Sequence, residues 1–168
     1  MSFASNCQHD VSEFIIKLIG QIHNDFEEYY RLNPVNALYP VQEFFQMRFK
    51  NTFKCLNCIE KEIVSEIVTE DPIIESHNIL KVEVPEIDND ENLDLINLIK
   101  SSFAEVEVTK NCTACSTTNV PHLVNYKLEN CPQILIVHLK RFQYNIQGSK
   151  KLDNKIQFSD NLNLNFLG

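Results

Sequence analysis

Two Cys-x-x-Cys pairs constrain the fold of this chain more than any other feature. Cys55 and Cys58 form the first pair, and Cys112 and Cys115 form the second. Two intervening residues let both sulfur atoms of a pair point into one small volume, and four thiolates are what a closed, tetrahedral structural zinc site requires. The spacing therefore predicts one structural Zn²⁺ ion, held by all four cysteines, that ties together distant parts of the chain.

Two other interpretations of the cysteine pairs remain open. Free cysteines often pack as small apolar side chains, so all four thiols could be buried without a metal. A redox dithiol of the thioredoxin type would need one pair to open a helix in a βαβ unit, whereas strand-like sequence flanks both pairs. We favour zinc because this spacing, found twice in one chain, is unusual for independent core cysteines.

Length and composition narrow the class of protein. The chain has 168 residues and 43% hydrophobic residues, which suits one domain or a piece of a larger one. Its start has no basic, apolar leader, so we expect reduced cysteines and a cytoplasmic or nuclear location. No apolar run approaches the roughly 20 residues of a membrane span. The net charge of −8 argues against a nucleic-acid partner.

The negative charge is concentrated in one stretch. Residues 60–94 hold 12 of the 23 acidic residues and only two basic ones, Lys61 and Lys81. Such a stretch is usually a solvated face of a folded region. Alternatively, its field would attract a basic partner.

Hydrophobic periodicity predicts an α+β chain. Residues 8–31 read as a long amphipathic helix, with Asp10 as its cap and Glu13 completing a capping box. The pattern of residues 134–144 is the strongest strand in the sequence, and its first half is apolar on both faces, which predicts a central, doubly covered strand. The other expected elements are strands within 40–53, 59–69, 79–84, 106–109, 120–128 and 155–158, and a helix at 93–103.

The order of motifs resembles the catalytic domain of the ubiquitin-specific proteases, which are cysteine-dependent deubiquitinases. The motifs that carry the resemblance are a Gln-His-Asp-Val-Ser-Glu-Phe helix start, the two cysteine pairs, Ile-Leu-Lys-Val-Glu-Val-Pro, Ile-Val-His-Leu-Lys-Arg-Phe and Lys-Leu-Asp-Asn-Lys-Ile-Gln-Phe. The resemblance implies a partial papain-like fold with mainly antiparallel β fingers and palm. It assigns residues 1–40 to a helical thumb fragment, 41–129 to zinc-binding fingers with an inserted helix, and 130–168 to a partial palm sheet.

The resemblance also implies that this chain holds no catalytic residue. In that family the nucleophile lies in an Asn-x-x-Cys box upstream of the Gln-x-Asp helix, and the general base lies in a downstream Gly-His-Tyr-like box. Neither box occurs in this sequence. Cys7 has His9 close by but no nucleophile role in the resemblance. We expect His138 to be a packed, hydrogen-bonded strand residue and Cys131 to be a buried thiol.

Binding residues can be carried over from the resemblance. In the family, the Gln-x-Asp helix start and the aromatic residue after Lys-Arg line the channel for the C-terminal tail of ubiquitin, which corresponds here to Gln8, Asp10 and Phe142. An aspartate at a helix start suits the arginines of that tail, although Asp10 can equally be a plain cap and Phe142 a core residue. The expected function is therefore part of a deubiquitinating enzyme that binds ubiquitin or ubiquitinated proteins. The alternative is a non-catalytic, zinc-stapled module that binds ubiquitin or another protein.

Overall fold

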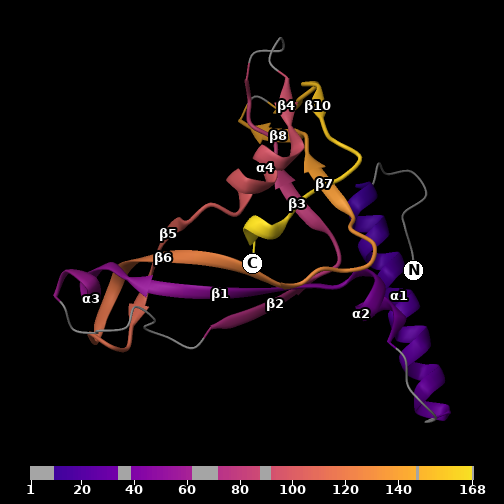
Figure 1. Ribbon diagram of the computed structural model, residues 1–168, viewed down its shortest axis with the longest axis horizontal. Helices are drawn as coiled ribbons and strands as arrows, with labels where there is room; N and C mark the ends of the chain where they lie inside the picture. The colour runs from indigo at the N-terminus through magenta and orange to yellow at the C-terminus, as the bar shows by residue number, and fades with distance from the viewer. Residues whose placement is uncertain (1–9, 34–38, 62–71, 88–91, 147, 168) are drawn as a thin grey trace. The chain divides into compact units, whose positions relative to one another are not determined.

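The chain divides into two compact units, each built from segments that are distant in the sequence. The computed structural model describes all residues except 1–9, 34–38, 62–71, 88–91, 147 and 168 (Figure 1). One unit comprises Met1–Met47, Ser76–Lys81 and Cys131–His138, and the other comprises Arg48–Glu75, Val82–Asn130 and Leu139–Gly168. Helices and an antiparallel sheet occur together, which confirms the predicted α+β class.

The long helix expected near the N-terminus is α1, Val11–Leu32. Asp10 caps it as predicted, because its Oδ1 accepts a hydrogen bond from the backbone N–H of Ser12 at 2.7 Å. The helix ends at Asn33, whose backbone N–H donates to the carbonyls of Tyr29 and Tyr30. In the sequence Asn33 precedes Pro34, and a residue before proline disfavours the α conformation, so local signals account for both ends of the helix.

The apolar residues of α1 are mostly exposed. Ile19 is buried, whereas Val11 is 71% exposed and Leu18 is 41% exposed. The helical periodicity was thus a correct indicator of secondary structure, but it did not indicate burial among the described residues. None of the described helices combines the length and the apolar composition needed to cross a membrane.

A short helix replaces the first half of the strand predicted within residues 40–53. This helix is α2, Pro40–Phe45, and Pro40 occupies its first turn, where the missing N–H breaks no intrahelical bond. The alternating residues follow it as strand β1, Met47–Cys55. The helix is tied to a distant segment in the same unit, because the N–H of Ile134 donates to the carbonyl of Phe44 at 2.8 Å.

The main sheet is antiparallel, with the strand order β2-β1-β6-β5. Its other strands are β2, Ile73–His77; β5, Val106–Cys112; and β6, Thr117–Asn130. Strands β1 and β5 both run antiparallel to β6, so they are parallel to each other and end where β6 begins. Both Cys-x-x-Cys pairs therefore arrive at the same end of the sheet (Figure 1).

The remaining elements form three small two-stranded sheets, one helix and a 3₁₀ turn. Helix α4, Leu95–Ser102, begins at Asp94, which accepts a hydrogen bond from the N–H of Asn97 at 3.0 Å. Strand β3 pairs with β7, β4 pairs in parallel with β10, and β8 pairs with β9. These elements are β3, Leu80–Glu83; β4, Leu93–Asp94; β7, Val137–Lys140; β8, Phe142–Asn145; β9, Gly148–Lys151; β10, Ile156–Gln157; and η1, Asn165–Leu167.

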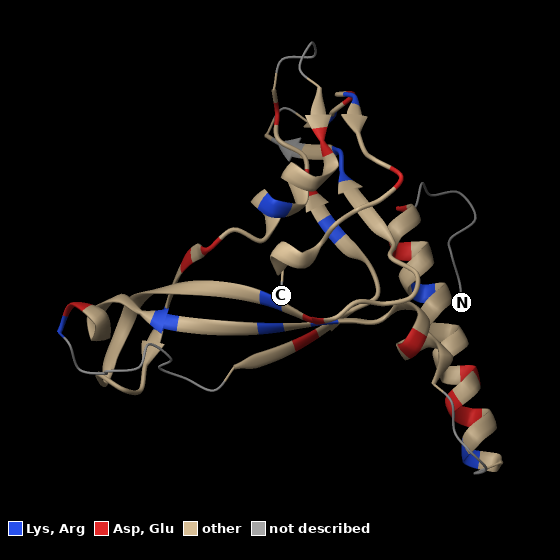
Figure 2. Cartoon of the chain, in the orientation of Figure 1, with Lys and Arg blue, Asp and Glu red and all other residues tan. Residues whose placement is uncertain are grey.

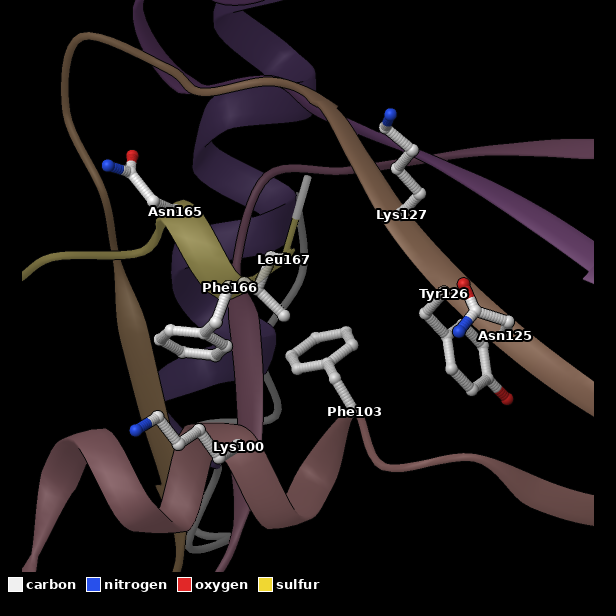
Figure 3. A pocket seen from close by; sticks show the side chains of 8 residues that line it. All are labelled: Lys100, Phe103, Asn125, Tyr126, Lys127, Asn165, Phe166 and Leu167. Atoms are coloured by element: carbon white, nitrogen blue, oxygen red, sulfur yellow. The ribbon is translucent and has the colours of Figure 1, made fainter.

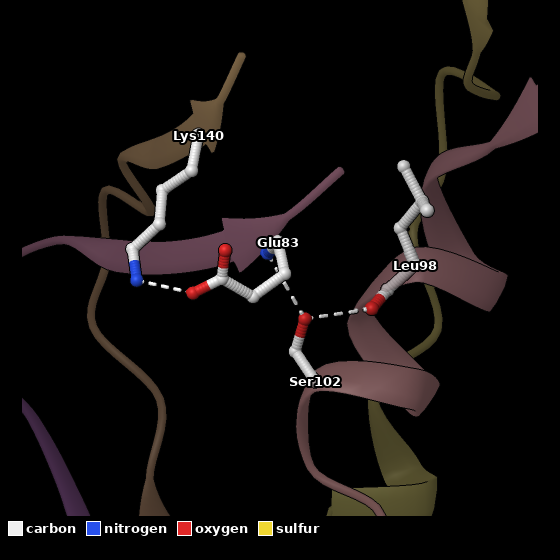
Figure 4. Close-up of polar contacts among 4 residues, drawn as sticks. All are labelled: Glu83, Leu98, Ser102 and Lys140. Carbon is white, nitrogen blue, oxygen red and sulfur yellow. Dashed lines mark hydrogen bonds and ion pairs between the residues drawn. The ribbon is translucent and has the colours of Figure 1, made fainter. Parts of the chain in front are cut away.

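Polar contacts fasten helix α4 to its neighbours within the larger unit. The Ser102 hydroxyl donates to the carbonyl of Leu98 at 2.9 Å and accepts from the N–H of Glu83 at 3.2 Å (Figure 4). The carboxylate of Glu83 in turn pairs with Lys140. One hydroxyl therefore links the last turn of α4 to strand β3.

Aromatic packing fastens the end of α4 to the main sheet. The ring of Phe103, the residue after α4, stacks on Phe49 of β1 with centroids 5.0 Å apart. Tyr126 of β6 meets the same ring edge-on at 6.0 Å. Such pairs add about 0.5–1.5 kcal/mol each beyond their buried area. This packing fixes the position of Phe103 against strands β1 and β6.

Most predicted strands are confirmed, and besides the strand within 40–53 two further predictions were wrong in part. The strand expected at 59–69 begins instead with the end of a short helix, α3, Leu56–Glu60, and residues 62–69 lie outside the described part. The strand expected at 134–144 is divided into β7 and β8 at Arg141. It is not the doubly covered central strand expected, because β7 has only β3 beside it in its described sheet and Ile134 is 48% exposed.

Candidate metal centre

Four cysteines converge at the end of the main sheet where β1 and β5 stop and β6 begins. Cys55 is the last residue of β1 and the N-cap of the five-residue helix α3, of which Cys58 is the third residue. Cys112 is the last residue of β5, and Cys115 follows in the turn before β6. The strand order places these two turns on either side of β6, so the sheet itself brings the two pairs together.

The distances between the sulfur atoms suit a four-coordinate metal ion. The Sγ atoms of Cys55 and Cys115 are 4.0 Å apart, and those of Cys58 and Cys112 are 3.6 Å apart. All four Sγ atoms lie within 4.8 Å of one another. A tetrahedral zinc site with Zn–S bonds of about 2.3 Å separates its sulfur atoms by roughly 3.8 Å. Each of the four is a free thiol rather than half of a disulfide.

The environment of the cluster is apolar and protected from solvent. Cys55, Cys58 and Cys112 are each at most 2% exposed and pack with Val120, whereas Cys115 is partly exposed. Burial raises the pKa of Cys55 and raises the pKa of Cys58 to about 12. Thiolates in such a place need a compensating positive charge, and a coordinated cation supplies it. The four cysteines could therefore hold a metal ion, and an all-thiolate donor set is of the kind that Zn²⁺ takes.

Cys115 differs from the other cysteines in its hydrogen bonding. Its partner is the side chain of Thr117, which lowers the pKa of Cys115 to about 7. The Thr117 hydroxyl also donates to the backbone carbonyl of Cys115 at 3.1 Å. The single hydroxyl proton of Thr117 serves one of these acceptors at a time, and its hydrogen bond to the sulfur favours the ionised thiol that a metal binds.

The turn that carries Cys115 has an unusual backbone. Ser116 and Asn119 have φ angles of 52° and 53°, in the left-handed region that non-glycine residues seldom occupy. The side chain of Asn111 stabilises the turn, because its Oδ1 accepts from the N–H of Asn119 at 3.1 Å. The second knuckle is thus locally fixed by polar residues.

The sequence interpretation missed a buried histidine beside the cluster. His122 lies directly opposite Cys55 in the β1–β6 ladder, so both side chains project from the same face. It is fully buried, its Nδ1 donates to the carbonyl of Val120 at 2.9 Å, and its Nε2 has no partner among the described residues. The alternation of Val120, His122 and Val124 along β6 was the available signal, because it assigns all three to the cysteine face.

The first cysteine pair opens a helix, contrary to the expectation of strands on both sides. That helix, α3, has five residues and follows an antiparallel strand rather than forming part of a βαβ unit. The thioredoxin-like interpretation therefore still lacks its structural context.

The residues expected to contact a ubiquitin tail are only partly placed. Gln8 lies outside the described residues, as do Cys7 and His9. Asp10 is exposed, and its hydrogen bonds from Ser12 lower its pKa. Phe142, in β8, is 54% exposed and belongs to the other unit, so it is not the core residue of the alternative interpretation.

The expectation for Cys131 was wrong, and that for His138 is met only in its position. Cys131, expected to be buried, is exposed between β6 and β7. His138 is packed in β7, but its Nδ1 is buried without a hydrogen-bond partner among the described residues. Neither side chain is arranged as a nucleophile or a base.

Comparisons with known proteins agree with the geometry. A family model described as ubiquitin carboxyl-terminal hydrolase matches residues 1–167. A probable ubiquitin carboxyl-terminal hydrolase 9 of Schizosaccharomyces pombe is 28% identical over 172 residues, covering 97% of this chain and 26% of that protein. Ubiquitin carboxyl-terminal hydrolase 29 of the mouse is 24% identical over 161 residues, covering 84% of this chain and 17% of that protein. The chain thus spans about a quarter or less of the length of these relatives.

Solved structures share the fold. A chain of the yeast SAGA DUB module superposes with a TM-score of 0.70 at 21% identity, covering 94% of this chain and 35% of that chain. A chain of the SAGA DUB module bound to ubiquitin aldehyde gives a TM-score of 0.67 at 21% identity, covering 95% of this chain and 33% of that chain.

Proposed function

Because the chain belongs to the ubiquitin carboxyl-terminal hydrolase family, we propose that it is a ubiquitin-binding portion of a deubiquitinating protease domain, stapled by one structural zinc ion. The observation that carries the metal part is the convergence of four thiol sulfur atoms within 4.8 Å at one end of a sheet. In this proposal residues 1–40, 41–129 and 130–168 contribute to thumb, fingers and palm respectively. The free cysteines favour a reducing compartment, the cytoplasm or nucleus.

The role of zinc in this proposal is mechanical. Cys55, Cys58, Cys112 and Cys115 would hold the ion, which supplies four metal–thiolate bonds and no reaction step. Thr117 orients Cys115 through the hydrogen bond to its backbone carbonyl. The packing of Val120 excludes water from the other three sulfur atoms. The β1–β6–β5 sheet would then present a surface of fixed shape to a partner.

Ubiquitin is the proposed partner, through Gln8, Asp10 and Phe142 and through the acidic stretch 60–94. Support comes from the exposure of Asp10 and Phe142, which leaves both side chains able to contact another molecule. The acidic stretch contributes less charge than its composition suggests. Glu83 and Glu86 are paired with Lys140 and Lys150, and Asp94 caps α4. We therefore expect weak binding in the high-micromolar range, which corresponds to about 5–6 kcal/mol.

The test is a titration of ¹⁵N-labelled ubiquitin with the zinc-loaded 168-residue chain at low and high salt. We expect ubiquitin resonances to shift, and the apparent affinity to fall as salt rises, because exposed charges are screened. Asp10→Asn keeps a good cap while removing the charge, so it should weaken binding without loss of helix. Phe142→Ala should also weaken binding, whereas Phe158→Ala, at an exposed aromatic residue outside the proposed contact, should not.

The same titration has outcomes that contradict the proposal. If folded, zinc-loaded protein shifts no ubiquitin resonance at millimolar concentration, these residues do not bind ubiquitin. If Phe158→Ala weakens binding as much as Phe142→Ala, the assigned contact at Phe142 is wrong.

A further inference from the structure

The sulfur contacts within the cysteine cluster cross from one Cys-x-x-Cys pair to the other. The Sγ atoms of Cys55 and Cys115 are 4.0 Å apart, and those of Cys58 and Cys112 are 3.6 Å apart. In the described part of the chain, no sulfur–sulfur hydrogen-bond contact of this kind joins the two cysteines of one pair. A disulfide needs its sulfur atoms at about 2.05 Å, so either crossing contact closes with a movement of less than about 2 Å. The geometry of the cluster therefore favours disulfides between the pairs over disulfides within them.

Two contacts hold β1 and β5 together near the cluster without the cysteines. The ammonium group of Lys110, in β5, lies 4.0 Å from the centroid of the Phe53 ring, in β1. Lys54, also in β1, pairs with Glu105, just before β5, at 3.6 Å. Figure 2 shows a basic segment at the cluster end of β1 and an acidic segment at the start of β5. Both contacts span β6, so we expect the two cysteine pairs to stay close when no metal is bound.

The opposite end of the sheet is also fastened without the cysteines. Phe103, which precedes β5, stacks on Phe49 of β1 and meets Tyr126 of β6 edge-on. Phe103 and Tyr126 also line a hollow of about 320 Å³, and none of the described residues that line it is a cysteine (Figure 3). We therefore expect the register of β1, β5 and β6 to persist in the metal-free chain.

Solvent reaches the four thiols of the cluster unequally. Cys55, Cys58 and Cys112 are each at most 2% exposed, whereas Cys115 is partly exposed. A small oxidant from solvent therefore reaches Cys115 first, and the crossing contact of Cys115 is with Cys55. The other two thiols remain as a buried pair, which an oxidant reaches more slowly.

We propose that the metal-free cluster is a reversible redox switch, which hydrogen peroxide closes by forming the disulfide Cys55–Cys115 and then the disulfide Cys58–Cys112. For each disulfide, one thiol sulfur attacks the peroxide, the O–O bond breaks, and a sulfenic acid and one water form. The second sulfur attacks the sulfenic sulfur, so that the S–S bond forms, the S–O bond breaks and a second water leaves. Two thiols thus lose two electrons and two protons to one peroxide molecule, and an external thiol reductant reverses the change.

The oxidised chain keeps the end of the main sheet closed but cannot take up metal. Both disulfides join the region at the end of β1 to the region at the end of β5, across β6, so they replace the metal as a link. Disulfide sulfur atoms are not the thiolates that zinc binds, so metal uptake then depends on a reductant. This last consequence rests on the proposed zinc site, whereas the disulfides themselves do not.

The experiment maps the disulfides by trypsin digestion and mass spectrometry. The 168-residue chain carries Cys7→Ser and Cys131→Ser, so that only the cluster thiols remain. It is stripped of metal with a chelator, oxidised with hydrogen peroxide and alkylated. Trypsin cuts at lysines on either side of each cysteine pair, which then lies on peptide 55–61 or on peptide 111–127. We expect these two peptides to be linked to each other, first by one disulfide and then by two.

Variants that retain only two cluster thiols test the pairing. Cys58→Ser with Cys112→Ser retains Cys55 and Cys115. Its matched control, Cys55→Ser with Cys112→Ser, retains Cys58 and Cys115. Both variants keep the partly exposed thiol and differ in the partner left to it, so the first should form its disulfide at least about threefold faster.

Zinc uptake, followed with a chromogenic chelator, gives an independent readout. The oxidised chain should bind less than about a tenth of the zinc that the reduced chain binds, and dithiothreitol should restore uptake. If the reduced chain takes up no zinc, the proposed zinc site fails, whereas the peptide map still decides the disulfides.

Three results would overturn the proposal. The first is a digest in which peptides 55–61 and 111–127 are each oxidised but not linked, because each pair has then closed on itself. The second is an equal rate of disulfide formation in the two matched variants. The third is an oxidised chain that binds as much zinc as a reduced chain that does bind it. Should the variants lose the sheet, as judged by circular dichroism, the peptide map of the intact cluster decides the matter.

Discussion

Cys58 and Cys112 lie 54 positions apart in the sequence, yet their Sγ atoms are 3.6 Å apart. One belongs to the helix that follows β1, and the other ends β5, on the opposite side of β6. A metal ion bound here closes a long loop of chain, which removes conformational entropy from the unfolded state as a disulfide does. The cluster is therefore expected to stabilise the far end of the sheet.

Replacing one ligand should release the metal and loosen this end of the sheet. Cys112→Ser leaves three thiolates, so we expect zinc affinity to fall by about 100-fold or more and the melting temperature to drop. Structural zinc sites contribute on the order of 10 kcal/mol of apparent binding energy. Competition with a chromogenic chelator measures the first effect and thermal unfolding the second. Cys131→Ser is the matched control, because that thiol is exposed and outside the cluster; equal effects of the two substitutions would exclude the site.

Acid should weaken the start of α1. The backbone N–H of Ser12 donates to Asp10 and holds its pKa below the ordinary value of 3.8. Because the pKa is lower in the folded than in the unfolded chain, the stabilisation by this carboxylate is full above the unfolded pKa and is lost as pH falls through the folded pKa. Circular dichroism can be followed from pH 6 downward, with the helical signal of each protein normalised to its value at neutral pH. The helical signal should begin to fall at a higher pH in the native chain than in Asp10→Asn.

Asp10→Ala provides the companion measurement at neutral pH. Removal of the cap should lower the stability of the helix by about 1 kcal/mol. If Asp10→Asn titrates with the same acid dependence as the native chain, the carboxylate of Asp10 is not the group responsible.

Arg141 should matter more for stability than its neighbour Lys140. Its Nη1 donates to the carbonyls of Leu152 and Asn154, at 3.1 and 2.9 Å, and so holds the segment between β9 and β10. Arg141→Met leaves both carbonyls without this donor and should lower the free energy of unfolding by about 2 kcal/mol. Lys140→Met breaks only an exposed pair with Glu83 and should cost less than about 1 kcal/mol. Urea unfolding of both variants decides the order, and the reverse order would refute this role of Arg141.

We expect the 168-residue chain not to hydrolyse ubiquitin conjugates. Four of its described cysteines form the cluster, Cys131 is exposed, and none of these five hydrogen-bonds to a histidine in the described part of the chain. A cysteine without a positioned base is only a few per cent thiolate near neutral pH. The assay is release of a fluorophore from the C-terminus of ubiquitin. Robust turnover that disappears on Cys7→Ala would show that our interpretation of Cys7 was wrong.

The sequence predicts those elements whose signals are local. The Asp10 cap sets the start of α1, the ranges predicted as strands at 106–109 and 120–128 fall within β5 and β6, and the Cys-x-x-Cys spacing predicts the cysteine cluster. Prediction from the sequence fails where tertiary contacts decide the local structure. Pro40 begins a helix within an apolar segment that also reads as a strand, and the run from Ile134 is divided at Arg141 although the residues on both sides of it read as strand.

Burial is the property that the sequence predicts least well. Apolar spacing identifies α1 as a helix, but whether Val11 is covered depends on which element lies beside it, and periodicity carries no such information. The same holds for Cys131, which was expected to be buried and is exposed, and for His122, whose burial was not predicted, because tertiary contacts rather than local sequence set both environments.

The most direct test of the account is the metal content of the purified chain. Elemental analysis after gel filtration in metal-free buffer should find one zinc per chain, and thiol titration of the folded protein should leave Cys55, Cys58, Cys112 and Cys115 unreactive until a chelator is added. Absence of zinc, with all four thiols freely titratable in the folded state, would contradict the account.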